Sequence, residues 1–183
     1  WDHLFSYFPR QKLAISSLCE QLGYGFKRHD LVYEAMTHRS AVEKNSPEGR
    51  RIRQVSGPVP WNERLEFLGD SVLGLAVSTM LWQKGADLSE GDLSRMRSGL
   101  VNEQVLAKLA RTLGIPKALI LGKGEKRSGG SEKDSLLADA FEALIGAIYL
   151  DSDFDTVKEI LEDRKSTRLN SSHQIISYAV FCL

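Results

Sequence analysis

Several features that would assign the chain to a special class of protein are scarce or absent. Its 183 residues include only two cysteines, Cys19 and Cys182, too few for the disulfide framework of a small secreted domain. No apolar run approaches the roughly 18 residues that cross a bilayer, so we expect no membrane partner. Basic and acidic residues number 24 each, so bulk charge does not favour a polyanionic ligand. These absences leave a globular protein suited to a reducing compartment, and we expect it in the cytoplasm.

The residues that are present have the composition and periodicity of a helical domain. Hydrophobic residues make up 42% of the chain and charged residues 26%, which excludes a wholly disordered protein. Apolar residues recur at helical spacing, and no alternation of period two indicates a sheet. The spacing predicts one helix ending at Gly23 and one that follows Asp30 as its N-cap. Further helices are predicted at about 62–83, 89–100, 102–113, 132–150 and 153–162. The predicted fold class is therefore all-α.

Clusters of proline and glycine residues mark the predicted loops and so divide the chain into segments. Residues 41–61 contain three prolines and two glycines and are predicted to be a long inserted loop. A second, Gly-rich and basic loop, GKGEKRSGG, is predicted at 122–130. We expect residues 1–10 to be an N-terminal extension and residues 11–162 to be one domain.

The last segment, 163–183, differs in style from the rest of the chain. Its sequence, DRKSTRLNSSHQIISYAVFCL, is Ser-rich and then abruptly apolar, and it resembles an in-frame translation of a sequencing-library adaptor. The alternative is a natural tail that forms an edge strand. If the tail is adaptor-derived, the natural protein continues past Glu162, and we expect that part of it is missing here.

The helix predicted over 62–83 has three acids on one face. Successive side chains turn by about 100°, so Glu63, Glu66 and Asp70 fall within about 60° of one another. The opposite side carries a predicted packing stripe, which consists of Leu65, Leu68, Val72 and Leu75.

The helix predicted over 132–150 repeats this arrangement. Asp139 and Glu142 share one face, about 60° apart. The opposite stripe consists of Leu137, Phe141, Leu144 and Ile148. If the two acidic faces converge, their carboxylates require neutralising cations, and hard oxygen ligands select Mg²⁺ or Mn²⁺ over zinc.

Two other interpretations of these acids were considered. The first is that they are ordinary solvated faces of surface helices. The second is a di-iron helical bundle, which requires Glu-x-x-His on two helices. Gly69 and Ile145 stand where the histidines would be, so the di-iron interpretation fails.

Five sequence motifs together resemble the endonuclease domain of the ribonuclease III family. NERLEFLGDS at 62–71 resembles its signature, and THRS at 37–40 precedes it. The other three are EGDLSRMRSGLV at 90–101, the Gly-rich basic loop and SLLADAFEALIGAIYLD at 135–151. The similarity spans about residues 11–162.

The resemblance implies a homodimeric, Mg²⁺-dependent endoribonuclease with an all-helical fold, for which Mn²⁺ can substitute and no small-molecule cofactor is needed. Its substrate would be double-stranded RNA, cut to 5′-phosphate and 3′-hydroxyl ends with short 3′ overhangs during rRNA and mRNA processing. By motif position, the metal ligands are Glu66, Asp70, Asp139 and Glu142. Asp70 and Glu142 are also the candidate catalytic residues. The supporting acids are Glu63 and Glu90.

The resemblance also implies partner contacts. Phe67 has a helical phase near the acidic face, so we expect it to be exposed and to pack into a second subunit. Candidate RNA contacts are Arg95, Arg97, Lys123, Lys126 and Arg127. We expect His38 and Arg39, in the THRS motif, to give structural support. By the same resemblance, a double-stranded-RNA-binding domain usually follows, and we expect that it belongs to the missing part of the natural protein.

A different class of function also fits the fold. A non-catalytic RNA-binding or ribosome-associated dimer could use the same helices, and loss of one or more of the acids would indicate it. All six acids are present, so the sequence favours the nuclease.

Overall fold

The computed structural model describes residues 8–43, 49–50, 54 and 59–162, and helices account for nearly all regular structure in these ranges. The helices are α2 (Pro9–Leu22), α3 (His29–Met36), α4 (Arg39–Val42), α6 (Glu63–Lys84), α7 (Glu90–Leu100), α8 (Glu103–Thr112), α9 (Ile115–Ala118), α10 (Lys123–Arg127), the 3₁₀ turn η1 (Gly130–Glu132), α11 (Asp134–Asp151) and α12 (Phe154–Glu162). Among these residues the β-pairing is an isolated parallel bridge between Thr37 and Ile120. The all-α prediction is therefore confirmed.

Local sequence explains where several helices begin and end. Pro9 opens α2, and Gly23, at a φ of 63°, closes it in the left-handed conformation. Ser89 and Asp92 form a reciprocal capping box at the start of α7. The side chain of Asn102 caps α8 by accepting a hydrogen bond from the amide of Val105.

Three local predictions were wrong. Asp30 lies inside the first turn of α3, and Arg28 occupies the N-cap. The Gly-rich segment at 122–130 is not a plain loop, because α10 forms within it. Ala41 and Val42 belong to α4, while most of the predicted inserted loop at 41–61 and all of 163–183 lie outside the described residues.

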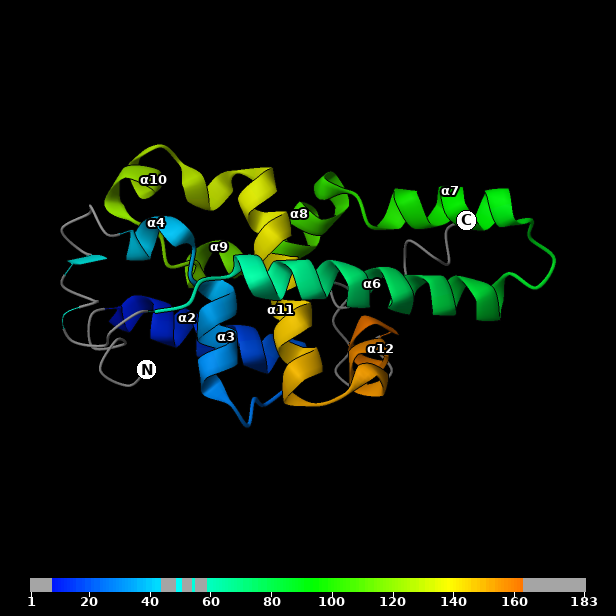
Figure 1. Cartoon of the computed structure of the whole chain (residues 1–183), viewed down its shortest axis with the longest axis horizontal. Helices are drawn as coiled ribbons and strands as arrows, with labels where there is room; N and C mark the ends of the chain where they lie inside the picture. The colour runs from blue at the N-terminus through cyan, green and yellow to red at the C-terminus, as the bar shows by residue number, and fades with distance from the viewer. Residues whose placement is uncertain (1–7, 44–48, 51–53, 55–58, 163–183) are drawn as a thin grey trace.

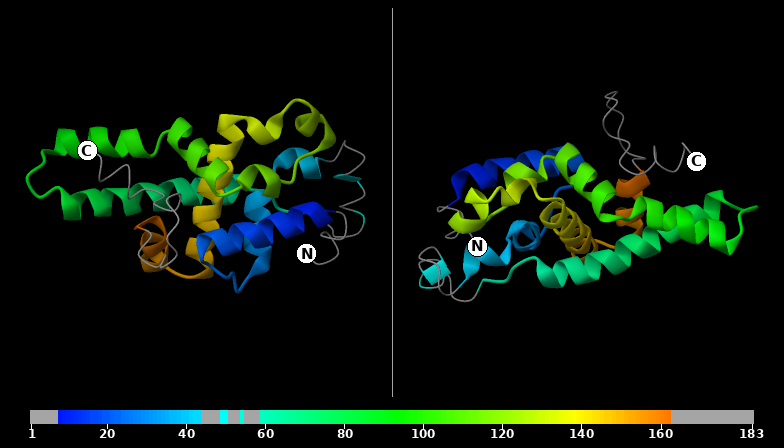
Figure 2. Two further views of the ribbon diagram at one scale, coloured as in Figure 1. Left: turned by 180° about the vertical axis from the view of Figure 1, so that it is seen from behind. Right: turned by 90° about the horizontal axis from the view of Figure 1, so that it is seen from above.

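Helix α11 is the centre of the bundle. It packs against α6, α8 and α3, which surround it in Figures 1 and 2. The predicted stripe on α11 is confirmed, since all four of its residues, Leu137, Phe141, Leu144 and Ile148, are at most 1% exposed. Burial continues around most of the helix, whereas Asp139 and Glu142 are only partly buried.

Helices α6 and α7 form an antiparallel hairpin whose far end extends beyond the rest of the bundle (Figure 1). The predicted α6 stripe was partly wrong, since Leu65 and Val72 are buried but Leu75 is 57% exposed. The buried face of α6 is centred on Leu73, Ala76 and Met80, and Leu75 lies on a different side of the helix. Trp82, two turns further along α6, is 74% exposed. Leu75 and Trp82 are therefore apolar side chains of α6 that the described residues leave exposed.

Helix α6 is also long and apolar enough, by length and composition alone, to cross a membrane. Core helices of globular proteins pass the same criterion. Because α6 packs along α11 and buries Leu73, Ala76, Val77 and Met80, it is a core helix here.

Candidate metal centre

The candidate site forms where α6 and α11 cross, and two glycines allow the crossing to be close. A Cβ atom on Gly69 would lie 1.8 Å from the carbonyl oxygen of Glu142, and one on Gly146 would lie 2.4 Å from the carbonyl oxygen of Leu65. The two backbones are therefore in direct contact. Glu66 is one turn before Gly69 on α6, so the crossing brings it against Glu142.

Three of the four predicted ligands meet at this crossing. One carboxylate oxygen from each of Glu66, Asp139 and Glu142 lies within 4.8 Å of the other two. All three side chains are partly buried. The two acidic faces therefore converge into one cluster, and the alternative of two separate solvated faces does not describe their arrangement.

Asp70 lies next to this cluster but outside its closest set. It is solvent-exposed, and its negative charge is the largest of the charge contributions that raise the pKa of Glu142. The fourth predicted ligand is therefore at the open side of the site, where a substrate or a water molecule has access to it.

The proximity of the carboxylates changes their protonation. Burial, followed by the charges of Asp70, Asp139 and Glu66, raises the pKa of Glu142 to about 7. Burial and neighbouring acids also raise the pKa of Glu66 and of Asp139. Burial contributes most to each shift, and repulsion between the negative charges of the neighbouring acids adds to it. The donor set fits a hard divalent cation, because oxygen ligands are held together and a bound cation would relieve their repulsion.

The two supporting acids have different positions. Glu63 is half-exposed and forms a 3.6 Å ion pair with Arg39, and its charge helps to raise the pKa of Glu66 and Asp139. Glu90, in contrast, begins α7 beside the far end of α6 and accepts a hydrogen bond from Ser94. The axial rise of α6 separates Glu66 from Lys84 by about 27 Å, so Glu90 is remote from the cluster of its own chain.

A further acid near the site, Glu103, was not predicted. It is the first residue of α8, and its charge is the largest charge contribution to the raised pKa of Asp139, after burial. Glu103 is the only acid on α8 and therefore forms no acidic face that periodicity could detect. Only the packing of α8 against α11 brings it close.

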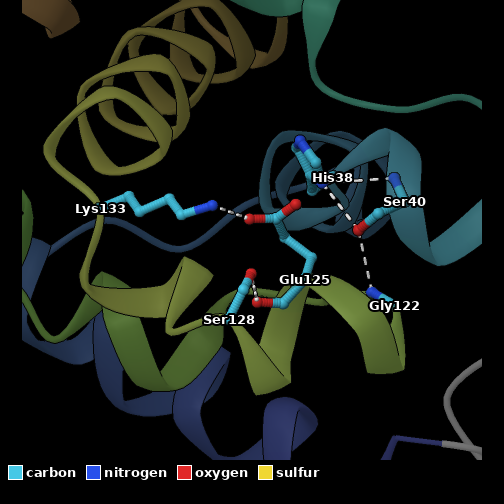
Figure 3. A network of polar contacts seen from close by, with 6 residues as sticks. All are labelled: His38, Ser40, Gly122, Glu125, Ser128 and Lys133. Atoms are coloured by element: carbon cyan, nitrogen blue, oxygen red, sulfur yellow. Dashed lines mark hydrogen bonds and ion pairs between the residues drawn. The ribbon is translucent and has the colours of Figure 1, made fainter.

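The candidate RNA contacts fall into two groups. On α7, Arg95 pairs with Asp92 of the same helix, and Arg97 donates a 3.4 Å hydrogen bond to Ser78. On α10, the side chains of Lys123, Lys126 and Arg127 are exposed. A network of polar contacts connects α10 to the rest of the bundle (Figure 3). This network includes His38 of the THRS motif. That placement agrees with a supporting role for His38.

Phe67, the predicted dimer contact, is 80% exposed, which is unusual for a phenylalanine on a core helix. It borders a groove of about 700 Å³ between α6, α3 and the end of α11, where Leu31, Leu68 and Leu150 form apolar walls.

Comparison with known proteins identifies this arrangement. A family model described as Ribonuclease-III-like matches residues 28–169. A protein named Ribonuclease 3 from Idiomarina loihiensis is 46% identical over 150 residues, which cover 82% of this chain and 58% of that protein. Ribonuclease 3 from Nitrosomonas europaea is 48% identical over 142 residues, which cover 78% of this chain and 51% of the relative.

Solved structures agree with the sequence matches. The nuclease domain of Ribonuclase III from Campylobacter jejuni aligns with a TM-score of 0.70 at 42% identity, covering 80% of this chain and 92% of that domain. The chain spans only about half to three-fifths of the length of the curated relatives above. The extent and identity of these matches show that the chain belongs to the ribonuclease-III-like family.

Proposed function

We propose that this chain is the endonuclease domain of a divalent-metal-dependent enzyme that hydrolyses phosphodiester bonds in double-stranded RNA. The observation that carries the proposal is the cluster of Glu66, Asp139 and Glu142, with carboxylate oxygens within 4.8 Å of one another, in a chain of this family. Mg²⁺ is the proposed ion and Mn²⁺ a substitute, since both prefer oxygen ligands. The proposed setting is rRNA and mRNA processing in the cytoplasm.

The proposed roles follow from burial and charge. Glu66, Asp139 and Glu142 would hold the ion, which when bound supplies positive charge and acidifies a water molecule. Asp70 is exposed at the edge of the cluster, so it is suited to orient the attacking water and to accept its proton. Attack of this water on the scissile phosphorus, in line with the departing 3′ oxygen, would leave 5′-phosphate and 3′-hydroxyl ends.

A homodimer is part of the proposal, because one site of this kind cuts one strand. The exposed Phe67 and its neighbouring apolar groove support self-association, as do the uncovered Leu75 and Trp82 on α6. A region of the Campylobacter jejuni nuclease domain is described as involved in dimer formation. Two sites related by a two-fold axis would cut opposite strands and leave short 3′ overhangs.

The dimer also gives Glu90 a possible role. Because Glu90 is at the far end of the α6–α7 hairpin, it can support a cluster only in a partner whose site the hairpin reaches. We therefore propose that Glu90 supports the partner's site rather than its own, whereas Glu63 supports the site of its own chain.

The basic side chains of α10 provide the proposed contact with RNA phosphates. An acidic metal site repels a polyanion, so positive charges beside it are required to hold the duplex. Lys123, Lys126 and Arg127 are exposed on a helix that leads directly through η1 into α11, the helix that carries Asp139 and Glu142. Arg95 and Arg97 on α7 are secondary candidates.

Incubation of the purified chain with a defined RNA duplex and Mg²⁺ tests the proposal. We expect staggered fragments with 5′-phosphate ends, no cutting of the separated strands, and no cutting in the presence of a chelator. Glu142→Gln should reduce cutting at least a thousandfold while duplex binding is retained. Binding without any cutting by the wild-type protein would contradict the proposal and indicate the non-catalytic alternative.

A further inference from the structure

Helix α10 is short and Gly-rich, so its own sequence does not explain its position. It has five residues, and isolated helices of that length are not stable in water. The chain just before it pairs with the segment after α3: the amide of Ile120 donates to the carbonyl of Met36 at 2.8 Å, and the amide of His38 donates to the carbonyl of Ile120 at 3.1 Å. This pairing brings the start of α10 against the THRS motif.

Ser40 continues the attachment to Gly122, the residue that precedes α10. The amide of Gly122, the N-cap of α10, donates a 3.0 Å hydrogen bond to the Ser40 hydroxyl oxygen (Figure 3). The contact is also close sterically, because a Cβ atom on Gly122 would lie 2.3 Å from the Ser40 carbonyl oxygen. The buried Gly122 is thus held at a fixed distance from Ser40.

His38 fixes the orientation of the Ser40 hydroxyl group. The Ser40 amide, which can only donate, points to Nδ1 of His38 at 3.3 Å, so Nδ1 carries no proton. The Ser40 oxygen lies 2.8 Å from the same nitrogen, and its hydroxyl group therefore donates to it. The Gly122 amide thus donates to the Ser40 oxygen, and the Ser40 hydroxyl group donates to the imidazole ring of His38.

A second attachment holds the middle of α10. Glu125, on its inner face, accepts a 2.6 Å hydrogen bond from Lys133, the residue immediately before α11. The Glu125 side chain is 23% exposed, whereas Lys123, Lys126 and Arg127 on the outer face are exposed. The inner side of α10 thus contacts the THRS segment and Lys133, just before α11, whereas its basic side is exposed to solvent.

We propose that Ser40, oriented by His38, and Glu125 are positioning residues that fix α10 so that its basic face meets duplex RNA in one orientation relative to the metal cluster. This proposal rests on the proposed function, and it concerns residues that touch neither the metal cluster nor the RNA. A preorganised basic helix loses less conformational entropy on binding than a mobile one. Loosening either attachment should therefore weaken RNA binding and leave the chemical step intact.

Ser40→Ala is the first test. We expect KM for a duplex to rise about fivefold, as expected for loss of one hydrogen bond, and kcat to stay within about twofold. Ser16→Ala, an exposed serine on α2, is the matched control and should change neither constant. A fall in kcat with unchanged KM would contradict the proposal.

Glu125→Gln separates positioning from simple electrostatics and does not depend on the folding of the Ser40 variant. Removing a negative charge next to a polyanion should tighten binding if charge alone matters. Positioning predicts the opposite, a dissociation constant about threefold higher, because the ion pair to Lys133 is lost. Fluorescence anisotropy with a labelled RNA duplex measures it in the Glu142→Gln background, where cutting is blocked. Tighter binding would overturn the proposal.

A double-mutant cycle completes the test. In a protein that lacks the α10 charges (Lys123→Ala, Lys126→Ala and Arg127→Ala), adding Ser40→Ala should not weaken binding further. The full fivefold effect in that background would show that Ser40 acts elsewhere and would overturn the proposal. If the wild-type chain does not bind duplex RNA at all, the proposed function fails and this proposal falls with it; if it binds and the variants match it, only this proposal fails.

Discussion

At the scale of single residues, Glu142 shows most clearly that the carboxylate cluster lowers the stability of the chain without a bound cation. Its pKa is raised to about 7, chiefly by burial and then by the neighbouring acids. Between the ordinary pKa of a glutamate and pH 7 the folded chain therefore binds more protons than the unfolded chain. Its contribution to stability falls as the pH rises through this window.

The first prediction concerns Glu142→Gln in the presence of a chelator. The substitution removes a charge that the folded state disfavours, so at pH 8 it should stabilise the protein by about 1 kcal/mol. This is well below the full value of the pKa shift, because solvent screens a half-buried group. Thermal unfolding should show a midpoint about 2–4 °C higher at pH 8 and no change near pH 4.5.

Glu20→Gln is the control for this prediction, since Glu20 is exposed on α2, a helix that carries no member of the cluster. It should leave the unfolding midpoint unchanged at both pH values. An equal gain from Glu142→Gln at pH 4.5 and pH 8 would mean that ionisation of the cluster is not its cause.

At the scale of secondary-structure elements, the crossing of α6 and α11 creates the site. Gly69 and Gly146 let the two backbones touch, and the acids lie on either side of the contact. Each helix alone offers only an acidic face backed by apolar residues. The metal-binding geometry is thus a property of the pair of helices.

Gly69→Ala tests this crossing. The added methyl group would overlap the carbonyl oxygen of Glu142, 1.8 Å from the ideal Cβ position, so α6 must move away from α11. We expect a loss of about 3 kcal/mol in the free energy of unfolding and a weakened metal site. Denaturant unfolding and metal titration of the same samples measure both effects.

Gly74→Ala provides a matched comparison on the same helix. Nothing lies within 4 Å of its ideal Cβ, so the higher helix propensity of alanine should stabilise the chain by about 0.5–1 kcal/mol. If Gly69→Ala proves no more harmful than Gly74→Ala, close packing at Gly69 is not what forms the site.

The crossing of α6 and α11 also shows which parts of the site could be predicted from the sequence. Helical periodicity grouped Glu66 with Asp70 and Asp139 with Glu142, because each pair lies on one helix. It could not show that Gly69, which stood out only as a missing ligand, lets the two groups meet. Glu103 was missed for a related reason, since one acid on a helix makes no pattern and reaches Asp139 only through packing.

The helix boundaries were predicted better where local signals agree. Gly85 and the Ser89 capping box mark the turn between α6 and α7. Helix α10 was missed, because its attachment to Ser40 and Lys133 overrides the low helix propensity of a Gly-rich segment. Leu75 was wrongly assigned to the buried stripe, since α6 is apolar on more than one face after Val72 and periodicity cannot show which face packs against α11.

At the scale of the whole molecule, the proposed homodimer would cover the exposed apolar residues of α6. Phe67→Ser should convert the proposed dimer into monomers while the unfolding free energy of the single chain changes by less than about 0.5 kcal/mol, because a side chain that is 80% exposed in one chain adds little to its fold. Sedimentation velocity measures the change. Leu13→Ser, a 74% exposed residue on α2, should leave the dimer intact. A Phe67→Ser protein that sediments as the wild type does would remove Phe67 from the interface.

Calorimetric titration of the chain with Mn²⁺ or Mg²⁺ at pH 7 tests most directly whether three carboxylates on two helices form one ion site. We expect saturable binding that releases protons, since the raised pKa of Glu142, about 7, leaves part of its carboxyl group protonated at that pH. Repeating the titration in buffers of different ionisation enthalpy gives the proton count. Glu142→Gln should abolish the proton release and weaken binding at least tenfold. Equal affinity in the wild-type and Glu142→Gln proteins, with no proton released by either, would contradict the account.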